Sequence, residues 1–254
     1  MKQARPFPVP PVAADNMPVH APLYPSPFVP YEARDQRILY CVCRGRQEAI
    51  RAILEPTPFD YAGDDRFAVS VVDFTGNVKC PFFDVAIVVP VSFRGQPGGH
   101  YVFEYEDNDA AIAAGRELWG YPKKQAVIGI ESRPDGTMVG WADRKGTRIV
   151  ELAIVPDAGA PMPPALATLP HLNLRTIPAP DGPGTSLRQV IGRDTSPDLV
   201  VKSRQPGRVE LSLAPVPGCP LDLFTPFEVL GGYVAVADFF ATPENGWGWV
   251  VADL

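Results

Sequence analysis

Short runs rich in Val, Ile, Phe and Tyr recur along the chain from residue 37 onward, and turn-forming residues separate them. This pattern is typical of β-strands. Pro134-Asp135-Gly136 and Lys145-Gly146 supply two of the turns, because proline presets φ and glycine accepts a positive φ. Strands are predicted over 37–43, 66–74, 82–93, 101–105, 126–132, 137–141, 147–155, 189–193, 199–203, 208–213 and 233–240.

Two segments depart from the strand pattern. Apolar residues at helical spacing predict a short helix over 47–54, which ends before Pro56. An alanine-rich run predicts a second helix over 109–118, and the polar residues 107–109 are good caps for it. Because long helices do not alternate with the strands, the fold class is predicted to be mainly antiparallel β (α+β). We expect a closed β-barrel with a few short helices, since closure removes the edge strands.

The first thirty residues form a proline-rich arm with nine prolines. Proline fixes φ and lacks a backbone donor, so residues 1–30 are not expected to form a helix or a central strand. They are assigned as an arm that precedes a single domain over 31–254. The arm also carries Phe7, Tyr24 and Phe28. Two alternatives stay open: a disordered tail, or a segment that packs along the body or a neighbouring subunit.

Composition excludes several classes of protein. A net charge of −6 argues against nucleic-acid binding, and no apolar run approaches the roughly 18 residues of a membrane span. The N-terminus lacks the apolar stretch of a secretory signal, so a cytoplasmic location is the default expectation. No pattern indicates a nucleotide, flavin, haem or metal site, and we expect neither a cofactor nor a metal. The cysteines are too few and too scattered for a disulfide scaffold: Cys41, Cys43, Cys80 and Cys219.

The densest candidate for chemistry is the segment 115–124, Gly-Arg-Glu-Leu-Trp-Gly-Tyr-Pro-Lys-Lys. Two adjacent ammonium groups, Lys123 and Lys124, repel each other, and the apolar strand that follows disfavours charge further. Both effects lower the pKa of a lysine. A neutral amine near pH 7 is a nucleophile that forms a Schiff base with a carbonyl. The alternative is that the two lysines form a solvated turn.

The order of motifs resembles the acetoacetate decarboxylase family. The resemblance rests on Asp107-Asn108-Asp109, on Gly115-Arg116-Glu117 and on Tyr121-Pro122-Lys123-Lys124, with further agreement at Val89–Phe93 and Asn173–Pro178. It covers roughly residues 31–242. It implies a cone-like barrel in a large homo-oligomer, with Lys123 as the Schiff-base lysine and Lys124 as the neighbour that tunes it.

The acidic and cationic residues that the resemblance implies are altered here. Asp84 occupies the position of a family glutamate and is the expected active-site acid, whereas Ala68 replaces a second glutamate. The substrate-side arginine of the family falls on Gln36, so Arg34 or Arg37 reaches the substrate only if a bulge shifts the strand.

The aromatic residues near the lysines are expected to bind a larger, less polar substrate than acetoacetate. They are Phe74, Phe82, Phe83, Phe103 and Tyr121.

These residues predict a lyase that acts on a small-molecule keto acid through an imine on Lys123, most simply a β-keto-acid decarboxylase. A protonated imine accepts the electron pair that is released as CO₂ leaves. Two alternatives stay open. One is an aldolase-dehydratase that acts on a 2-oxo acid or a larger keto compound. The other is a non-catalytic binding barrel of the same fold.

Overall fold

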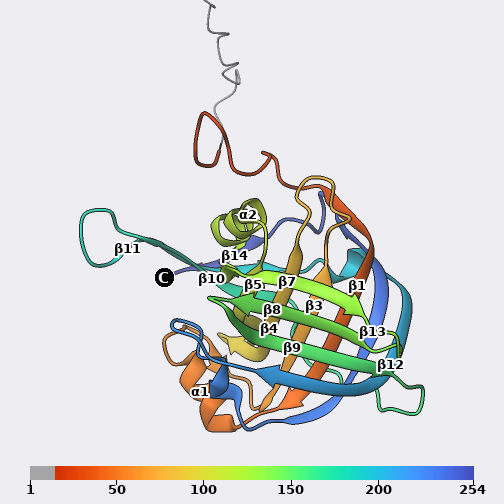
Figure 1. Cartoon of the computed structure of the whole chain (residues 1–254). Helices are drawn as coiled ribbons and strands as arrows, with labels where there is room; N and C mark the ends of the chain where they lie inside the picture. The colour runs from red at the N-terminus through yellow and green to blue at the C-terminus, as the bar shows by residue number, and fades with distance from the viewer. Residues whose placement is uncertain (1–14) are drawn as a thin grey trace, which may run out of the picture.

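The computed structural model describes residues 15–254, and the chain is mainly β (Figure 1). Two α-helices, α1 (Gln47–Leu54) and α2 (Asp109–Trp119), and two 3₁₀ turns, η1 (Ser196–Asp198) and η2 (Leu221–Phe224), accompany the strands. The strands are β1 (Tyr31–Arg44), β2 (Asp60–Tyr61), β3 (Arg66–Asp73), β4 (Phe83–Phe93), β5 (Gln96–Glu106), β6 (Lys123–Gln125), β7 (Val127–Ser132), β8 (Met138–Arg144), β9 (Thr147–Pro156), β10 (His171–Pro178), β11 (Thr185–Arg193), β12 (Leu199–Leu213), β13 (Glu228–Ala241) and β14 (Trp249–Asp253).

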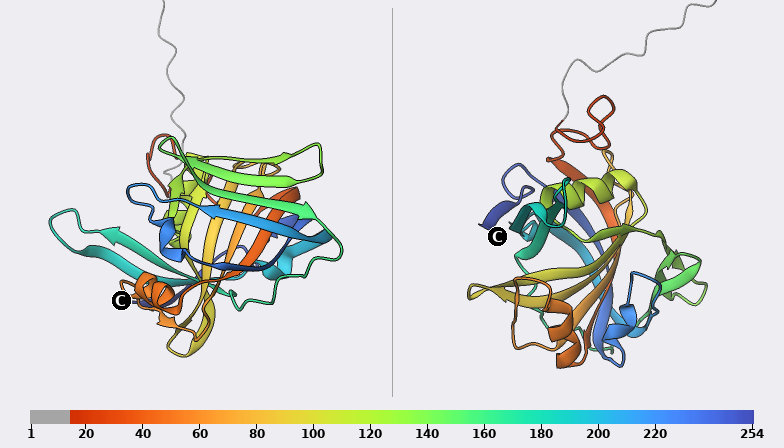
Figure 2. Two further views of the ribbon diagram at one scale, coloured as in Figure 1. Left: turned by 60° about the horizontal axis from the view of Figure 1, so that its bottom comes forward. Right: turned by 90° about the vertical axis from the view of Figure 1, so that its left-hand side faces the viewer.

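All strands belong to one strongly curled sheet (Figure 2). Its order is β14-β11-β10-β5-β4-β3-β1-β13-β12-β9-β8-β7, with β2 on β4 and β6 on β5 as branches. The pairs are antiparallel except β10 with β5 and β5 with β6. The expected antiparallel sheet is therefore confirmed.

The expected closed barrel is wrong, because the sheet order has two ends, β14 and β7. Strand β6 runs along β5, and the Ala126 N–H donates to the Glu106 carbonyl. The chain then leaves β5, and β7 pairs with β8 alone. Between β6 and β7 the two parts of the curled sheet are therefore connected by the covalent chain and not by a hydrogen-bonded ladder.

Both predicted helices form, and α2 extends one residue beyond the expected end. The two strands predicted over 199–203 and 208–213 are one strand, β12, which passes through Pro206 and pairs with β13 and then β9. The sequence pattern missed β2, β6, β10 and β14. Three of these are very short or lie at the edge of the sheet, where neighbouring segments, more than local apolar content, define the strand.

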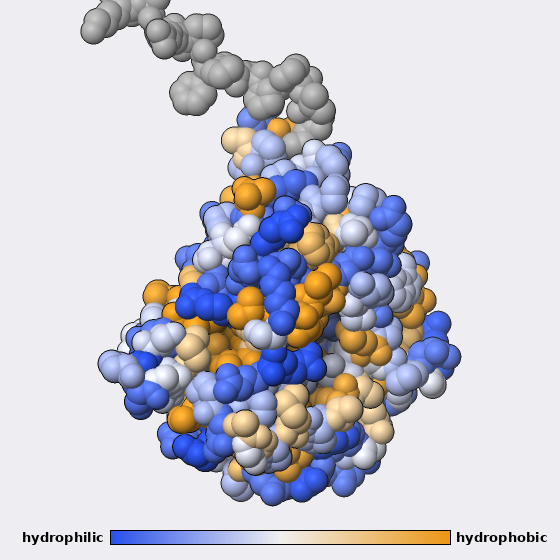
Figure 3. All heavy atoms as spheres, turned by 90° about the vertical axis from the view of Figure 1, so that its right-hand side faces the viewer, coloured by the Kyte–Doolittle hydropathy of each residue, from blue (hydrophilic) through white to orange (hydrophobic). Residues whose placement is uncertain are grey.

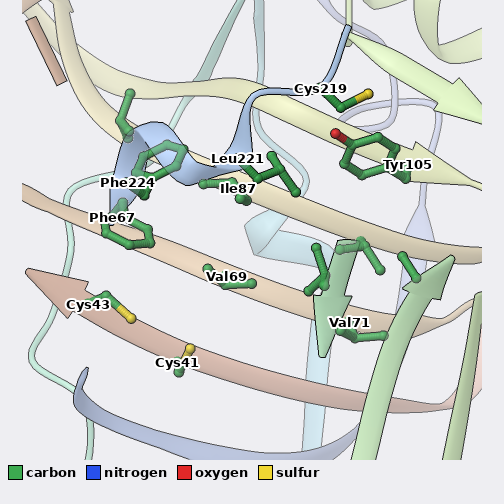
Figure 4. Packing of buried hydrophobic residues seen from close by; sticks show 14 of the residues in the cluster. Cys41, Cys43, Phe67, Val69, Val71, Ile87, Tyr105, Cys219, Leu221 and Phe224 are labelled. Carbon is green, nitrogen blue, oxygen red and sulfur yellow. The ribbon is translucent and has the colours of Figure 1, made fainter. Parts of the chain in front are cut away.

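One face of the sheet encloses the main apolar core (Figure 4). Alternate residues of β1, β3 and β4 point into this core, and η2 adds the side chains of Leu221 and Phe224. Cys41, Cys43 and Cys219 are buried free thiols of this core. Labelled members in Figure 4 are Cys41, Cys43, Phe67, Val69, Val71, Ile87, Tyr105, Cys219, Leu221 and Phe224. On β3, β4 and β5 the alternating residues Ser70, Asp84 and Glu104 lie on the opposite face, where Ala111 of α2 lines the same cavity.

Residues 15–30 pack against α2 as a strap. Tyr24 and Phe28 are buried, and the Tyr24 hydroxyl donates to Glu117 on α2 at 2.8 Å. The Phe28 ring lies 5.8 Å from that of Trp119, centroid to centroid. Of the two alternatives for the arm, its described part adopts the packed one. Phe7 lies outside the described residues.

None of the helices within residues 15–254 is long and apolar enough to cross a membrane. The surface still carries apolar side chains, and Figure 3 shows them gathered between polar residues on one face. Among all exposed large apolar side chains of the described chain are Val200 and Val201 on β12 and, on a separate strand, Trp249 and Val250 on β14.

Candidate active site

Helix α2 and the turn after it place Lys123. The Asn108 side chain accepts from the N–H groups of Ala110 and Ala111 and so begins the helix, and Gly120 ends it at φ 71°. Glycine adopts that conformation readily because it has no Cβ. A second glycine, Gly115, leaves room for the lysine side chain, since a Cβ there would lie 2.5 Å from Cδ of Lys123. The helix therefore leaves a groove in which the lysine side chain lies.

Strand β6 then fixes which lysine enters the site. It pairs in parallel with β5, so that Lys123 is opposite Glu104 and Lys124 is opposite Tyr105. Successive side chains of a strand point to opposite faces. Lys123 is buried among polar groups, whereas Lys124 points the other way and donates to the Gly218 carbonyl at 2.6 Å. The structure does not bring Lys124 to the site, and this expectation is wrong.

Three buried carboxyl groups surround the Lys123 ammonium. Nζ donates to Glu106 Oε1 in a short hydrogen bond and lies 3.5 Å from Glu104 Oε1. Asp84 on β4 is opposite Glu106 in the sheet and completes the group. The predicted acid Asp84 is therefore in the site, whereas Glu104 and Glu106 were not predicted. Their signal was present: two glutamates at alternate positions of one strand, next to Val102, Phe103 and Tyr105, share one face.

Charge determines the protonation of this cluster. Burial opposes the ammonium of Lys123, but the carboxylates of Glu104, Glu106 and Asp84 outweigh it and raise its pKa. The predicted lowering of the pKa is therefore wrong, because the lysine faces carboxylates and not a second ammonium. Burial raises the pKa of Glu106 to about 8. Burial and the neighbouring carboxylates raise the pKa of Glu104 well above its usual range.

Burial raises the pKa of Asp84 as well, and the neighbouring Lys123 ammonium and Glu104 offset this effect only in part. Because the pKa values of both carboxyl groups are raised, Glu104 and Asp84 do not both ionise readily, and one of them keeps a proton. At neutral pH the cluster contains an ammonium, at least one carboxylate and a carboxylic acid within hydrogen-bonding reach of one another. Such a set can both remove and return protons during a reaction.

Aromatic rings form a large part of the wall of the cavity above the lysine, which has a volume of about 130 Å³. The Lys123 Nζ lies 5.3 Å from the ring centroid of Tyr121 and 5.4 Å from that of Phe82. Of the five aromatic residues predicted near the site, Tyr121, Phe74 and Phe82 line the cavity, whereas Phe83 and Phe103 pack against the main core.

Neither predicted arginine reaches this cavity. The bulge that could return one exists, since the register of β1 shifts between Ala33 and Gln36 and Asp35 has φ 53°. Arg34 nevertheless is exposed and pairs with Glu32. Arg37 pairs with Asp73 at 2.7 Å. The expectation that Arg34 or Arg37 binds substrate is therefore wrong for this structure.

A different arginine, Arg193 at the end of β11, lines the cavity, and His171 at the start of β10 lies near it. The His171 Nδ1 lies 2.8 Å from the Tyr121 hydroxyl. Burial and the charge of Arg193 lower the pKa of His171 to about 3, so the ring is neutral. No local sequence signal marked either residue, because only the curl of the sheet brings β10 and β11 beside α2.

The three carboxyl groups are also the arrangement most suited to a metal ion in the described chain, with oxygens within 4.8 Å of one another. Hard divalent cations prefer such oxygen ligands. Here, however, the Lys123 ammonium already lies among them and supplies the positive charge. The donor set therefore fits a charge-paired lysine better than it fits a bound cation.

Comparison with known proteins shows which family the chain is similar to. The sequence model of a family described as acetoacetate decarboxylase (ADC) matches residues 16–246. An acetoacetate decarboxylase of Burkholderia multivorans is 30% identical over 247 residues, which cover 93% of this chain and 94% of that protein.

Two solved structures share the fold. An acetoacetate decarboxylase of Legionella pneumophila has a TM-score of 0.78 at 22% identity, covering 96% of this chain and 94% of the other. The enduracididine biosynthesis enzyme MppR, solved in complex with pyruvate, has a TM-score of 0.71 at 19% identity, covering 94% and 98%.

Proposed function

The chain belongs to the acetoacetate decarboxylase family, and we propose that it is a lyase that binds a keto acid as a Schiff base on Lys123. The single observation that carries the proposal is the placement of the Lys123 amine, buried among three carboxyl groups at the wall of an aromatic cavity. Its simplest reaction is decarboxylation of a β-keto acid.

The carboxyl groups provide the proton transfers that this reaction needs. A carboxylate of the cluster takes a proton from the ammonium, and the free amine attacks the carbonyl carbon. A carboxylic acid protonates the departing oxygen, water leaves, and a protonated imine remains. The bond to the carboxylate then breaks, CO₂ departs, and the electron pair moves into the imine to give an enamine. Glu104 protonates the enamine carbon, and water hydrolyses the new imine to release the ketone and the amine.

The pair Glu104–Asp84 supports a second candidate, an aldolase-dehydratase that acts on a 2-oxo acid or a larger keto compound. Dehydration requires a base that removes a proton from carbon and an acid that protonates the departing hydroxyl. A carboxylate and a carboxylic acid that share a proton supply both. The likeness to MppR, whose structure contains pyruvate, is in keeping with this candidate.

Trapping with borohydride tests the proposal and separates it from a non-catalytic binding role. The protein is incubated with acetoacetate or with pyruvate, reduced, and examined by intact mass and peptide mapping. We expect a secondary amine on Lys123 in the wild type and in the control Lys124→Ala, whose side chain faces away from the site. Lys123→Ala should give no adduct and no turnover. An adduct in Lys123→Ala, or none in the wild type, would contradict the mechanism.

A further inference from the structure

Arg193 is a buried guanidinium whose bonded partners are all uncharged. It is 6% exposed and lines the cavity. Its Nε donates to the Gly246 carbonyl and its Nη2 to the Tyr31 hydroxyl, both at 3.0 Å. Its Cζ lies 3.9 Å from the ring centroid of Trp119. These contacts hold the planar group in one orientation at the cavity wall.

The guanidinium lacks a counterion. Within residues 15–254, no ion pair joins Arg193 to a carboxylate. The adjacent Asp194 instead accepts from the Ser196 N–H. The carboxyl groups of the cavity all surround Lys123. Burying a charge without a counterion is unfavourable. The Arg193 guanidinium is therefore suited to bind a negatively charged group of a ligand.

Tyr121 extends this wall toward Lys123. Its hydroxyl lies 2.8 Å from Nδ1 of the neutral His171, and its side chain lines the same cavity as Arg193. Its ring lies 5.3 Å from the Lys123 Nζ. The cavity therefore has two poles: an amine with carboxyl groups at one, and a guanidinium with hydroxyl groups at the other. Carboxyl groups beside Lys123 repel a second carboxylate there, whereas the guanidinium attracts it.

We infer that Arg193 and Tyr121 form a subsite for a substrate carboxylate that is retained in the product. The inference rests on the proposed Schiff base at Lys123 and specifies its substrate class: a keto acid whose Arg193-bound carboxylate is not the group that leaves. A carboxylate in an ion pair is stabilised as an anion, and its departure as neutral CO₂ would lose that ion pair. Arg193 therefore opposes loss of the carboxylate that it binds.

This substrate class includes 3-oxo dicarboxylates, which lose one carboxylate and keep the other, and oxo acids that undergo aldol-type cleavage. Acetoacetate is outside it, because its one carboxylate is the leaving group. Poor activity on acetoacetate follows from the charge at Arg193.

Trapping of two ketones that cannot decarboxylate tests the subsite. Levulinate carries a carboxylate, and 2-pentanone is its neutral counterpart. In the wild type we expect borohydride to trap levulinate about tenfold more readily, or better, which is the effect of one charge-assisted contact. Arg193→Met should lower the ratio of levulinate trapping to 2-pentanone trapping from about ten to about one. Arg188→Met, half-buried on the same strand but away from the cavity, is the matched control.

Equal trapping of both ketones by the wild type would overturn the subsite, even if Arg193→Met does not fold. Trapping of neither ketone would instead overturn the Schiff base. The retained carboxylate is tested on the wild type by steady-state kinetics. We expect kcat/KM for 3-oxoglutarate to exceed that for acetoacetate by about tenfold or more. A preference for acetoacetate would overturn that part of the inference.

Discussion

The ammonium of Lys123 is stabilised against the cost of its burial by Glu104, Glu106 and Asp84. The amine becomes a nucleophile only when one of these groups takes its proton. The protonation of the lysine is thus coupled to that of its neighbours. The number of carboxylates in contact with Nζ determines the pH at which an imine forms.

Glu106→Gln removes the carboxylate that accepts the hydrogen bond from Nζ. The pKa of Lys123 should fall, because one of the charges that favour the ammonium is lost. A larger fraction of amine is then present at any given pH. The pH profile of 2-pentanone trapping should therefore move to lower pH, by about one unit or more. Glu117→Gln, on the α2 surface that contacts Tyr24, should leave the profile in place, and an unshifted profile in Glu106→Gln would contradict the electrostatic account.

Glu104→Gln tests proton transfer to carbon. The amide keeps the size of the side chain but cannot deliver a proton, so imine formation should persist while kcat falls by about 10²- to 10⁴-fold. Trapping yield and turnover are measured on the same preparation. If trapping and turnover fall together, Glu104 acts on the structure of the site and not on the proton transfer.

At the scale of elements, the sequence predicted those helices and strands whose formation depends on residues within the same segment. Helix α2 was predicted because its caps and alanines lie within the segment itself. The strands of the core were predicted because apolar alternation marks them. The resemblance to the family named Lys123 and Asp84, and both side chains line the same cavity; their roles stay a prediction.

The remainder depends on contacts between distant segments. Parallel pairing of β6 with β5 turns Lys124 away from the site and places Glu104 and Glu106 beside Lys123. The same pairing reverses the expected direction of the pKa shift. Arg193 is brought to the cavity only by the curl of the sheet, and no spacing along the chain encodes that approach.

Gly115→Ala tests the groove that α2 leaves for Lys123. A Cβ at this position would overlap the lysine side chain, so trapping and turnover should each fall about tenfold or more. The helix itself should not lose stability, since alanine is favoured over glycine by about 0.5–1 kcal/mol in a helix. Thermal unfolding and circular dichroism check this point. Gly182→Ala, where a Cβ meets open space, is the control, and full activity in Gly115→Ala would exclude the groove.

At the scale of the whole molecule, the strap over 15–30 joins the N-terminal segment to the wall of the cavity. Phe28 lines the cavity, and Tyr24 fixes the strap to Glu117. The strap also covers Trp119, on which the Arg193 guanidinium stacks. The binding site is thus completed by a segment outside the sheet. Assembly into a homo-oligomer stays a prediction.

A chain that begins at residue 31 should be less stable by about 4 kcal/mol, because burial of Tyr24 and Phe28 contributes about 2 kcal/mol each. Its kcat/KM should also fall as the cavity opens to water. A chain that begins at residue 15 keeps the strap and is the reference for both properties. Denaturant unfolding and steady-state kinetics compare the two chains. Equal stability of the two shortened chains would show that the strap is dispensable.

Glu104 and Glu106 alternate along β5, and their side chains set the acid–base chemistry of the site. The fold depends instead on the backbone of this strand. The backbone of β5 forms the ladder with β6 whatever side chains occupy these two positions. Apolar residues there would leave Lys123 facing fewer charges, and burial would then favour the free amine. Two such substitutions would leave Asp84 as the one carboxylate of the three beside Lys123 and would lower the pKa of the lysine, while the ladder between β5 and β6 is kept. Descendants of such a protein can acquire new chemistry through this strand while the lysine and its helix stay unchanged.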